Sequence, residues 1–229
     1  MPTKKIKSTK PHRINADVLV AGATGLAGSA FLTLMRNDPS AGKIIALTRR
    51  QNGAVSDVSH IRQGIVDFAN LAEFKDLLCA RTLVCALGTT IKKAGSKEAF
   101  RQVDYRLPMD IAGYAAQNGC EIFILISAMG ANPNSYVFYS HVKGELERDV
   151  QTLGFKSIHI IRPSLLMGDR KEFRLGEEIG KLLIWPFTSL IPDKYKPVHV
   201  EVIARKIKSL LKDDSPGVHI YEGKQIHES

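Results

Sequence analysis

The stretch DVLVAGATGLAG, residues 17–28, sets the architecture expected for this chain of 229 residues. It begins with a short apolar run that ends in glycine, which is typical of a buried strand. Residues 26–37 then carry apolar side chains at helical spacing. A strand, a glycine turn and a helix in this order open a βαβ unit, so the stretch indicates an α/β chain.

The glycines of this turn suggest what it binds. Gly22, Gly25 and Gly28 recur at three-residue spacing between the expected strand and helix. Glycine permits positive φ angles and the close backbone approach that a diphosphate requires. The helix N-terminus adds free N–H groups and a partial positive charge. We therefore expect this turn, together with Thr24 and Leu26, to hold a nucleotide cofactor; a plain glycine-rich turn is the alternative.

Strand-like and helix-like segments alternate along the rest of the chain. A helix near 70–79, a longer one around 96–118 with a kink at Pro108, and one holding Tyr139 and Lys143 separate the strands. Unbroken apolar strands divided by helices predict a doubly wound parallel sheet, Rossmann-like, with ligands beyond the carboxyl ends of the strands. The further strands are expected at residues 43–48, 61–67, 82–88, 121–127 and 157–163.

The length favours a single NAD(P)-binding domain over residues 16–229. The chain after Pro163 is long enough for a small C-terminal cap on the substrate side, at about residues 164–200, but not for an independent domain. Residues 1–15 read as a disordered basic tail. They supply five of the nine net positive charges, through Lys4, Lys5, Lys7, Lys10 and Arg13.

The composition excludes several classes of protein. Hydrophobic residues at 44% and charged residues at 24% are ordinary for a globular chain. No apolar run reaches the roughly 20 residues of a membrane span, and the N-terminus lacks the apolar core of a secretory signal. Three cysteines without CxxC, and histidines without HExxH spacing, indicate neither disulfides nor a metal. We expect a cytoplasmic protein without a specific nucleic-acid partner.

The end of the second expected strand bears on which dinucleotide binds. An NAD-preferring site places an acidic side chain there for the ribose hydroxyl. This chain reads ALTRRQNG, and its next acid is Asp57. Guanidinium groups pair with a 2′-phosphate that a carboxylate would repel, so Arg49 and Arg50 favour NADP. The alternative is that both arginines only solvate a loop.

YSHVKGE, residues 139–145, places Tyr139 four positions before Lys143 and so on the same helix face. By itself this spacing is more often a stripe of a solvated surface than a proton-transfer pair. His141, offset by two, points off that face.

Taken together, GATGLAG, TRR, CALGTT, RQVDY, ISAMG, YSHVKGELE and IRPSLLMG resemble the atypical branch of the short-chain dehydrogenase/reductase superfamily. The stretches ALGTT, KAGSKEAFRQVDY, VKGELE and IRPSLLMGDR are similar to its Tat-interacting-protein-like group. The resemblance runs from about residue 17 to 227 with motifs in the family's order.

The resemblance implies roles for three catalytic residues. Tyr139 would protonate a carbonyl oxygen during hydride delivery. Lys143 would lower the pKa of this phenol, ordinarily about 10, and hold the nicotinamide ribose. Ser127 would hydrogen-bond the substrate oxygen. In this setting the Tyr139/Lys143 pair becomes a functional pair.

The resemblance also implies cofactor contacts. Asp67 would contact the adenine, Leu87, Gly88 and Thr89 the ribose and diphosphate, and Pro163 would back the nicotinamide. Two departures stand out: CALG has no asparagine, and ISAMG has one serine where many relatives have two.

The expected function is an NADP-dependent oxidoreductase acting on a small carbonyl or alcohol. One alternative is an NADPH-binding redox sensor with little turnover. A nucleotide-sugar epimerase is another, against which the short C-terminal region counts. Most apolar side chains within residues 172–192 are expected to pack as the substrate-side cap, and an exposed share would form a lipophilic substrate mouth or a dimer patch. A homodimer or a protein partner is thus an open alternative.

Overall fold

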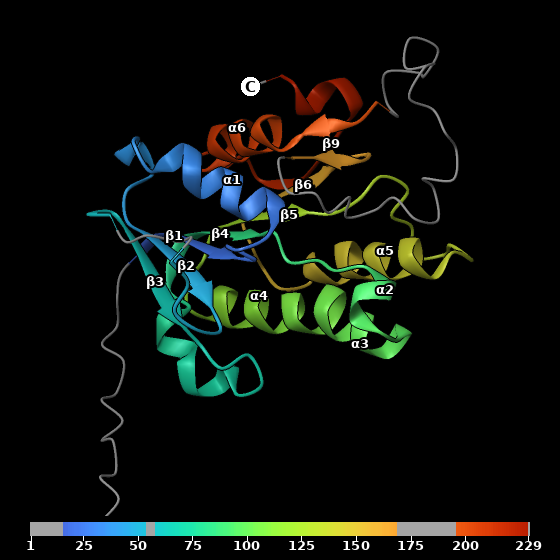
Figure 1. Ribbon diagram of the computed structural model, residues 1–229, viewed down its shortest axis with the longest axis horizontal. Coiled ribbons are helices and arrows are strands. Elements are labelled where there is room, and N and C mark those ends of the chain that lie inside the picture. Colours follow the sequence, from blue (N-terminus) through green and yellow to red (C-terminus); the bar gives the residue numbers. More distant parts are fainter. Residues whose placement is uncertain (1–15, 54–57, 169–195, 229) are drawn as a thin grey trace, which may run out of the picture.

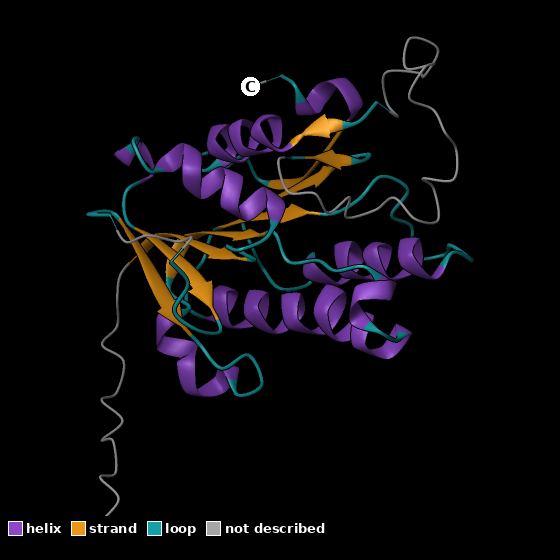
Figure 2. Ribbon diagram, in the orientation of Figure 1, coloured by secondary structure: helices purple, strands orange, loops and turns teal. Residues whose placement is uncertain are grey.

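A parallel sheet of seven strands forms the centre of the molecule (Figures 1 and 2). The computed structural model describes residues 16–53, 58–168 and 196–228. The strand order is β3-β2-β1-β4-β5-β6-β9, and every neighbouring pair is parallel. Chain order reverses between β1 and β4, which is the point where doubly wound sheets bind ligands. The strands are β1 (Ala16–Ala21), β2 (Ile44–Thr48), β3 (Ile61–Ile65), β4 (Ala80–Cys85), β5 (Ile122–Ile126), β6 (Ser157–Arg162) and β9 (Gly217–Glu222).

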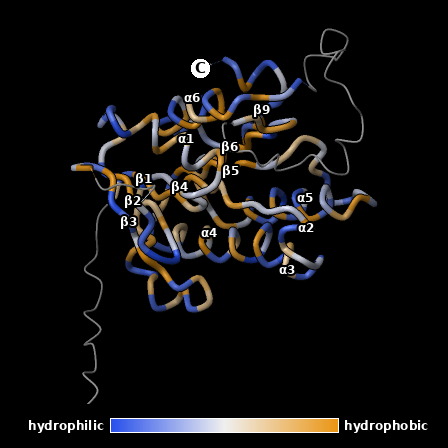
Figure 3. The backbone as a smooth tube through the Cα atoms, viewed as in Figure 1, coloured by the Kyte–Doolittle hydropathy of each residue, from blue (hydrophilic) through white to orange (hydrophobic). Residues whose placement is uncertain are grey.

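Helices cover both faces of the sheet (Figure 1). On one face lie α1 (Leu26–Met35) and α6 (Val200–Leu210); on the other lie α4 (Leu107–Gln117), α5 (Phe138–Val150) and the 3-10 helix η2 (Leu71–Leu77). Hydropathy follows this layering: apolar residues line the strands and the inner helix faces (Figure 3). The shorter elements are η1 (Pro39–Ala41), α2 (Ile91–Ala94), α3 (Lys97–Arg101), η3 (Gln102–Arg106), β7 (Leu166–Met167), β8 (Val198–His199) and η6 (Gly223–Ile226).

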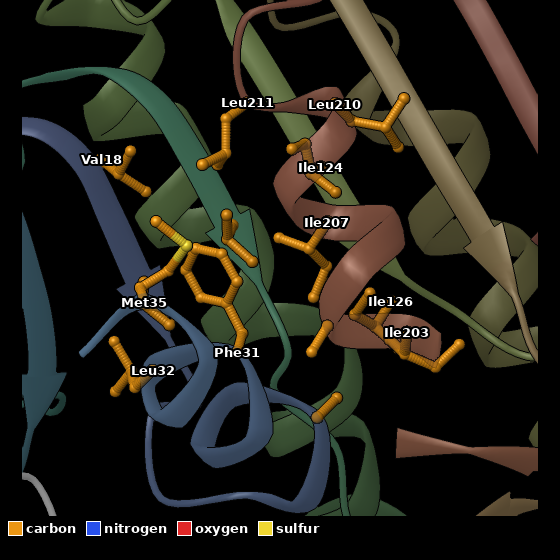
Figure 4. Packing of buried hydrophobic residues seen from close by; sticks show 14 of the residues in the cluster. Val18, Phe31, Leu32, Met35, Ile124, Ile126, Ile203, Ile207, Leu210 and Leu211 are labelled. Carbon is orange, nitrogen blue, oxygen red and sulfur yellow. The ribbon is translucent and has the colours of Figure 1, made fainter. Parts of the chain in front are cut away.

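The contact between α1 and α6 is apolar. Phe31 and Met35 of α1 are fully buried against Ile203 and Ile207 of α6, above the strands (Figure 4). The helical spacing of these residues puts them on one face of each helix. Each such side chain, moved out of water, stabilises the fold by roughly 1.5–3 kcal/mol.

The six predicted strands and the doubly wound parallel sheet are confirmed. The long helix predicted around 96–118 is also present, but its irregularity lies before Pro108. Residues 102–106 form a π-helical turn between α3 and α4. A proline ring lacks an N–H and crowds the carbonyl four residues earlier, which here belongs to Asp104. A widened turn accommodates both effects.

The C-terminal residues have a role that the sequence analysis did not predict. Beyond residue 196, α6 packs on α1, and β9 extends the sheet beside β6. In β9 the polar His219 and Tyr221 are the partly buried residues, whereas Val218 and Ile220 are exposed, so the strand has no unbroken apolar run. Of the predicted cap at 164–200, residues 169–195 lie outside the described residues, as do the predicted tail and the whole apolar stretch at 172–192. Within the described ranges, no helix combines the length and apolar character needed to cross a bilayer.

Candidate active site

The predicted site residues gather at one edge of the sheet. Gly22 follows β1, residues 86–89 follow β4, Ser127 follows β5 and Pro163 follows β6. Because these neighbouring strands are parallel, their carboxyl ends share an edge. The Ser127 N–H donates to the Ile161 carbonyl at 2.8 Å, which continues the sheet bonding into the site. These segments lie beside the switch point between β1 and β4.

The glycine turn is as tight as its sequence predicts. Gly22 has φ +83°, and a Cβ there would lie 2.4 Å from the carbonyl carbon and oxygen of Ala86. A Cβ on Gly28 would lie 2.3 Å from the Gly22 oxygen. The Gly25 N–H donates to that same oxygen at 2.9 Å, and Gly25 precedes the first residue of α1. Only glycine fits the two crowded positions.

The rest of the turn suits an anionic ligand. Thr24 is exposed at its tip, whereas Leu26 is buried at the start of α1. The first turn of α1 carries no acidic side chain. Free N–H groups and the helix dipole therefore face this edge without a competing negative charge. The chemistry of the turn fits the diphosphate of a dinucleotide.

The residues predicted to hold the adenosine half lie at the ends of β2 and β3. Arg49 and Arg50 follow β2 and are exposed. The Asp67 carboxylate after β3 accepts hydrogen bonds from the Ala69 N–H at 3.0 Å and the Asn70 Nδ2 at 2.7 Å. The Ala69 bond, then the Asn70 bond, lowers the pKa of Asp67. Asp67 thus stabilises its own turn, and its contact with adenine stays a prediction.

A buried ion pair lies next to the loop after β4. Lys143 Nζ is 2.7 Å from Asp104 Oδ1, with the lysine side chain 4% and the aspartate 0% exposed. The other carboxylate oxygen, Oδ2, accepts the Thr89 N–H at 2.8 Å. A Cβ on Gly88 would stand 3.4 Å from Asp104 Oδ1 and 3.8 Å from Lys143 Nζ. Gly88 thus lies beside Lys143, and Thr89 is linked to Lys143 through Asp104. Leu87, just before them, is half-buried.

Tyr139 lies one turn before Lys143 on α5, half-buried, with its ring centroid 5.6 Å from that of Phe100. Burial raises the pKa of Tyr139 above its usual value; Lys143 opposes this effect and Asp104 adds to it. The prediction from the sequence was that Lys143 lowers the pKa of Tyr139 overall. Lys143 does act to lower this pKa, but burial and the Asp104 carboxylate raise it by more.

Burial by itself would lower the pKa of Lys143. The attraction of Asp104, assisted by Tyr139, exceeds that effect and raises it. Lys143 is therefore a protonated ammonium throughout the physiological range.

Asp104 was not among the predicted site residues, although it lies in the RQVDY stretch. The buried positions along this helix include Phe100, Asp104, Pro108 and Ile111. An acid in step with a buried apolar face is rarely tolerated without a partner. That periodicity was the available signal.

The Ser127 hydroxyl lacks a partner within the described ranges. Ser127 Oγ is buried at the end of β5, and the described residues offer it no hydrogen-bond partner. Such a hydroxyl is costly unless something else binds it.

Cys85 ends β4, and burial raises the pKa of its thiol to about 11, so it stays protonated. His141 Nε2 lies 3.5 Å from Glu145 at a partly exposed position, in keeping with its predicted surface placement. The described ranges contain no cluster of His, Cys, Asp and Glu able to hold a metal.

The fold and these motifs define an atypical short-chain dehydrogenase/reductase, a class of NAD(P)-binding Rossmann proteins related to HTATIP2. The chain belongs to the HIM1 family, whose sequence model matches residues 51–183. It is 32% identical over 193 residues to the mitochondrial protein FMP52 of Candida albicans, covering 81% of this chain and 83% of that one. It is 31% identical over 219 residues to HTATIP2 of Rattus norvegicus, covering 93% and 88%.

Among solved structures, MoeE5 in complex with UDP-glucose and NAD superposes with a TM-score of 0.67 at 17% identity, over 92% of this chain and 79% of that one. This likeness shows the shared fold.

The expected cytoplasmic location is contradicted by these comparisons. The FMP52 relatives from Candida albicans, Candida glabrata and Saccharomyces cerevisiae are all named as mitochondrial proteins. The expectation rested on unpaired cysteines and on the lack of a secretory signal. Both observations argue against secretion, but neither distinguishes one reducing compartment from another.

Proposed function

We propose that this chain is an NADP-dependent oxidoreductase that transfers hydride to or from a small carbonyl or alcohol. The observation that carries the proposal is the buried Ser127 hydroxyl, which has no partner among the described residues. Ser127 follows β5 at the edge of the sheet, and α5 supplies Tyr139 and the buried, charged Lys143. A substrate oxygen would give this hydroxyl the hydrogen bond that it lacks.

The cofactor would lie across the switch point. The turn from Gly22 to Gly28 would hold its diphosphate, Arg49 and Arg50 its 2′-phosphate, and Asp67 its adenine. Residues 87–89 would line its ribose side, with Pro163 behind the nicotinamide. When bound, the nicotinamide supplies or accepts the hydride.

The remaining chemistry belongs to the chain itself. Because the pKa of Tyr139 is raised, its phenol carries a proton at neutral pH and can donate it to a carbonyl oxygen. Ser127 would donate a hydrogen bond to the same oxygen and orient it. The Lys143 ammonium would stabilise the phenolate left after proton transfer.

Tyr139→Phe tests the proposed proton transfer. We expect NADPH oxidation, screened over a panel of carbonyl compounds, to fall about 10²- to 10⁴-fold. NADPH binding measured by calorimetry should persist, because the phenol is not needed to hold the diphosphate. Tyr136→Phe is the matched control, since Tyr136 is fully exposed and should keep full activity. Oxidation that survives in Tyr139→Phe would contradict the proposal.

Arg49→Ala tests the choice of cofactor. Losing a charge-assisted contact to the 2′-phosphate costs about 1.5–3 kcal/mol, or roughly 10- to 100-fold in affinity. We expect this loss for NADPH and little change for NADH, both by calorimetry. Equal losses for both dinucleotides would show that Arg49 does not read the 2′-phosphate.

A redox-sensing role is the second candidate. Lys143 already has a carboxylate partner, and burial holds Tyr139 in its neutral form. Both features would slow turnover without weakening cofactor binding. Tight NADPH binding with no oxidation over a broad carbonyl panel would favour the sensor. An epimerase is less favoured, because β9 extends the sheet and α6 packs on α1, which leaves only a short segment for a nucleotide-sugar site.

From the names of the FMP52 relatives we also infer a mitochondrial location. Fractionation of cells that express the full chain with a C-terminal tag tests this; enrichment outside mitochondria would contradict it.

A further inference from the structure

We infer that Asp104 is a positioning residue for the proposed reaction: its carboxylate holds the Lys143 ammonium in place and ties it to the cofactor loop at Thr89. The inference rests on the proposed function, and it assigns a residue that the sequence motifs left without a role.

The two carboxylate oxygens contact separate parts of the chain, one through an ion pair and the other through a hydrogen bond. Oδ1 lies 2.7 Å from Lys143 Nζ on α5, and Oδ2 accepts the Thr89 N–H at 2.8 Å from the loop after β4. Asp104 itself comes from the π-helical turn η3, so it joins three elements. Because both contacts are short and buried, a displacement of the loop at Thr89 is transmitted to the ammonium.

A carboxylate, rather than an amide, is required by charge. An ammonium as buried as Lys143 is strongly disfavoured without an opposite charge. Within the part of the chain that the structure describes, the titratable groups that face the pair are Tyr139, on the same helix as Lys143, and Cys85 at the end of β4. Both are neutral at physiological pH, since burial raises the pKa of each. Asp104 is thus the counter-charge that keeps this cluster neutral as a whole.

Removing the Asp104 charge should change how the cluster titrates. Without it, Lys143 and Tyr139 would carry a net positive charge in a buried place, and one proton would leave more easily. Tyr139 and Lys143 are coupled, so this proton belongs to the pair and not to either residue alone. The first deprotonation of the pair therefore moves to lower pH, whichever group releases the proton.

Asp104→Asn in the cofactor-free full chain tests this. Asparagine keeps the shape, and its amide oxygen can still accept the Thr89 N–H. Tyrosinate absorbance follows Tyr139 among the six tyrosines after subtraction of the Tyr139→Phe curve. Carbon NMR of the lysine side chains follows Lys143, assigned with Lys143→Met. We expect the first of the two midpoints to fall by about 1–3 pH units. Unchanged midpoints in a folded protein would overturn the inference.

Glu147→Gln is the matched control. Glu147 is another buried carboxylate on α5, but it pairs with Arg162 through bonds of 2.5–3.1 Å and does not face Tyr139. Its loss should lower stability and leave the titration unchanged. A shift as large as that of Asp104→Asn would show that any loss of buried charge moves the titration, and would overturn the inference.

A second measurement covers the case in which Asp104→Asn does not fold. Lys143→Met alone leaves the Asp104 carboxylate buried without its partner, whereas the double variant Asp104→Asn, Lys143→Met removes both charges. We expect the double variant to have the higher Tm of the two. A lower Tm would overturn the inference. Neither test needs cofactor or turnover, so failure here is separate from failure of the oxidation assay that tests the proposed function.

Discussion

Two helix contacts, one on each face of the sheet, are built in opposite ways. Where α1 meets α6, the buried side chains are aliphatic and aromatic, among them Phe31, Met35 and Ile207 (Figure 4). Where the helix of residues 97–117 meets α5, directional polar pairs are prominent. They are Lys143 with Asp104 at 2.7 Å, Arg101 with Glu145 at 2.5 Å, and Tyr105 with Asp149 at 2.7 Å.

The α5 face has an apolar core of its own, including Ile111, Leu146 and Val150, so the difference lies in the polar pairs added there, which place the candidate site. Apolar contact is non-directional and scales with buried area, so it supplies stability without fixing single atoms. Hydrogen bonds and ion pairs fix distance and angle, and a buried one is costly to leave half made. The α5 contact therefore sets the register in which Tyr139 and Lys143 reach the sheet edge. The predictions below separate these two roles.

Phe31→Ala should cause the largest loss of stability. Removing this fully buried ring opens a cavity in the α1/α6 contact and costs about 3–5 kcal/mol of unfolding free energy. Urea denaturation measures the loss. Thr33→Ala, exposed on the same helix, is the control and should stay within about 0.5 kcal/mol. If the Tyr139 titration moved as well, the two faces would not be independent.

Alkaline pH should weaken the α5 contact. Burial raises the pKa of Tyr139, and Asp104 raises that of Lys143 against the effect of burial. Both groups hold their protons more tightly folded than unfolded, so this stabilisation is complete below their ordinary pKa values of about 10 and is lost above them. We expect Tm to fall above pH about 10, and to fall less in the double variant Asp104→Asn, Lys143→Met. Parallel curves for the two proteins would contradict this.

Tyr105→Phe should have the smallest effect of the three. It removes the hydroxyl bonded to Asp149 at the partly exposed end of the α5 contact and costs about 0.5–1.5 kcal/mol. Thermal unfolding measures the change. Tyr114→Phe on α4 serves as a comparison, because the described residues give its hydroxyl no partner. A larger loss of stability in Tyr114→Phe than in Tyr105→Phe would show that the hydrogen bond between Tyr105 and Asp149 does not stabilise the contact.

The fold was largely predictable because its signals are local. The apolar runs, the glycine spacing at Gly22, Gly25 and Gly28 and the alternation of elements each depend on residues close together in the chain. Strand β9 was missed because the side chains that it turns toward β6 are polar: His219 and Tyr221 contact His159, so no apolar run marks the strand.

The candidate site was predicted in part for the same reason. Ser127, Tyr139, Lys143 and the loop of residues 87–89 lie where the strand order puts them. The role of Asp104 was missed because spacing within its helix marks only a buried acid that needs a partner; that the partners are Lys143 and Thr89, on other elements, is not visible in that spacing.

The sequence by itself determined the class of fold and the edge of the sheet where the candidate site lies, since a tight glycine turn and an apolar strand are properties of short segments. Only the tertiary structure decided the charge balance there. Burial and the ion pair between Asp104 and Lys143 depend on contacts between elements far apart in the chain. Because of them, Tyr139 holds its proton more tightly than the nearby Lys143 alone would suggest.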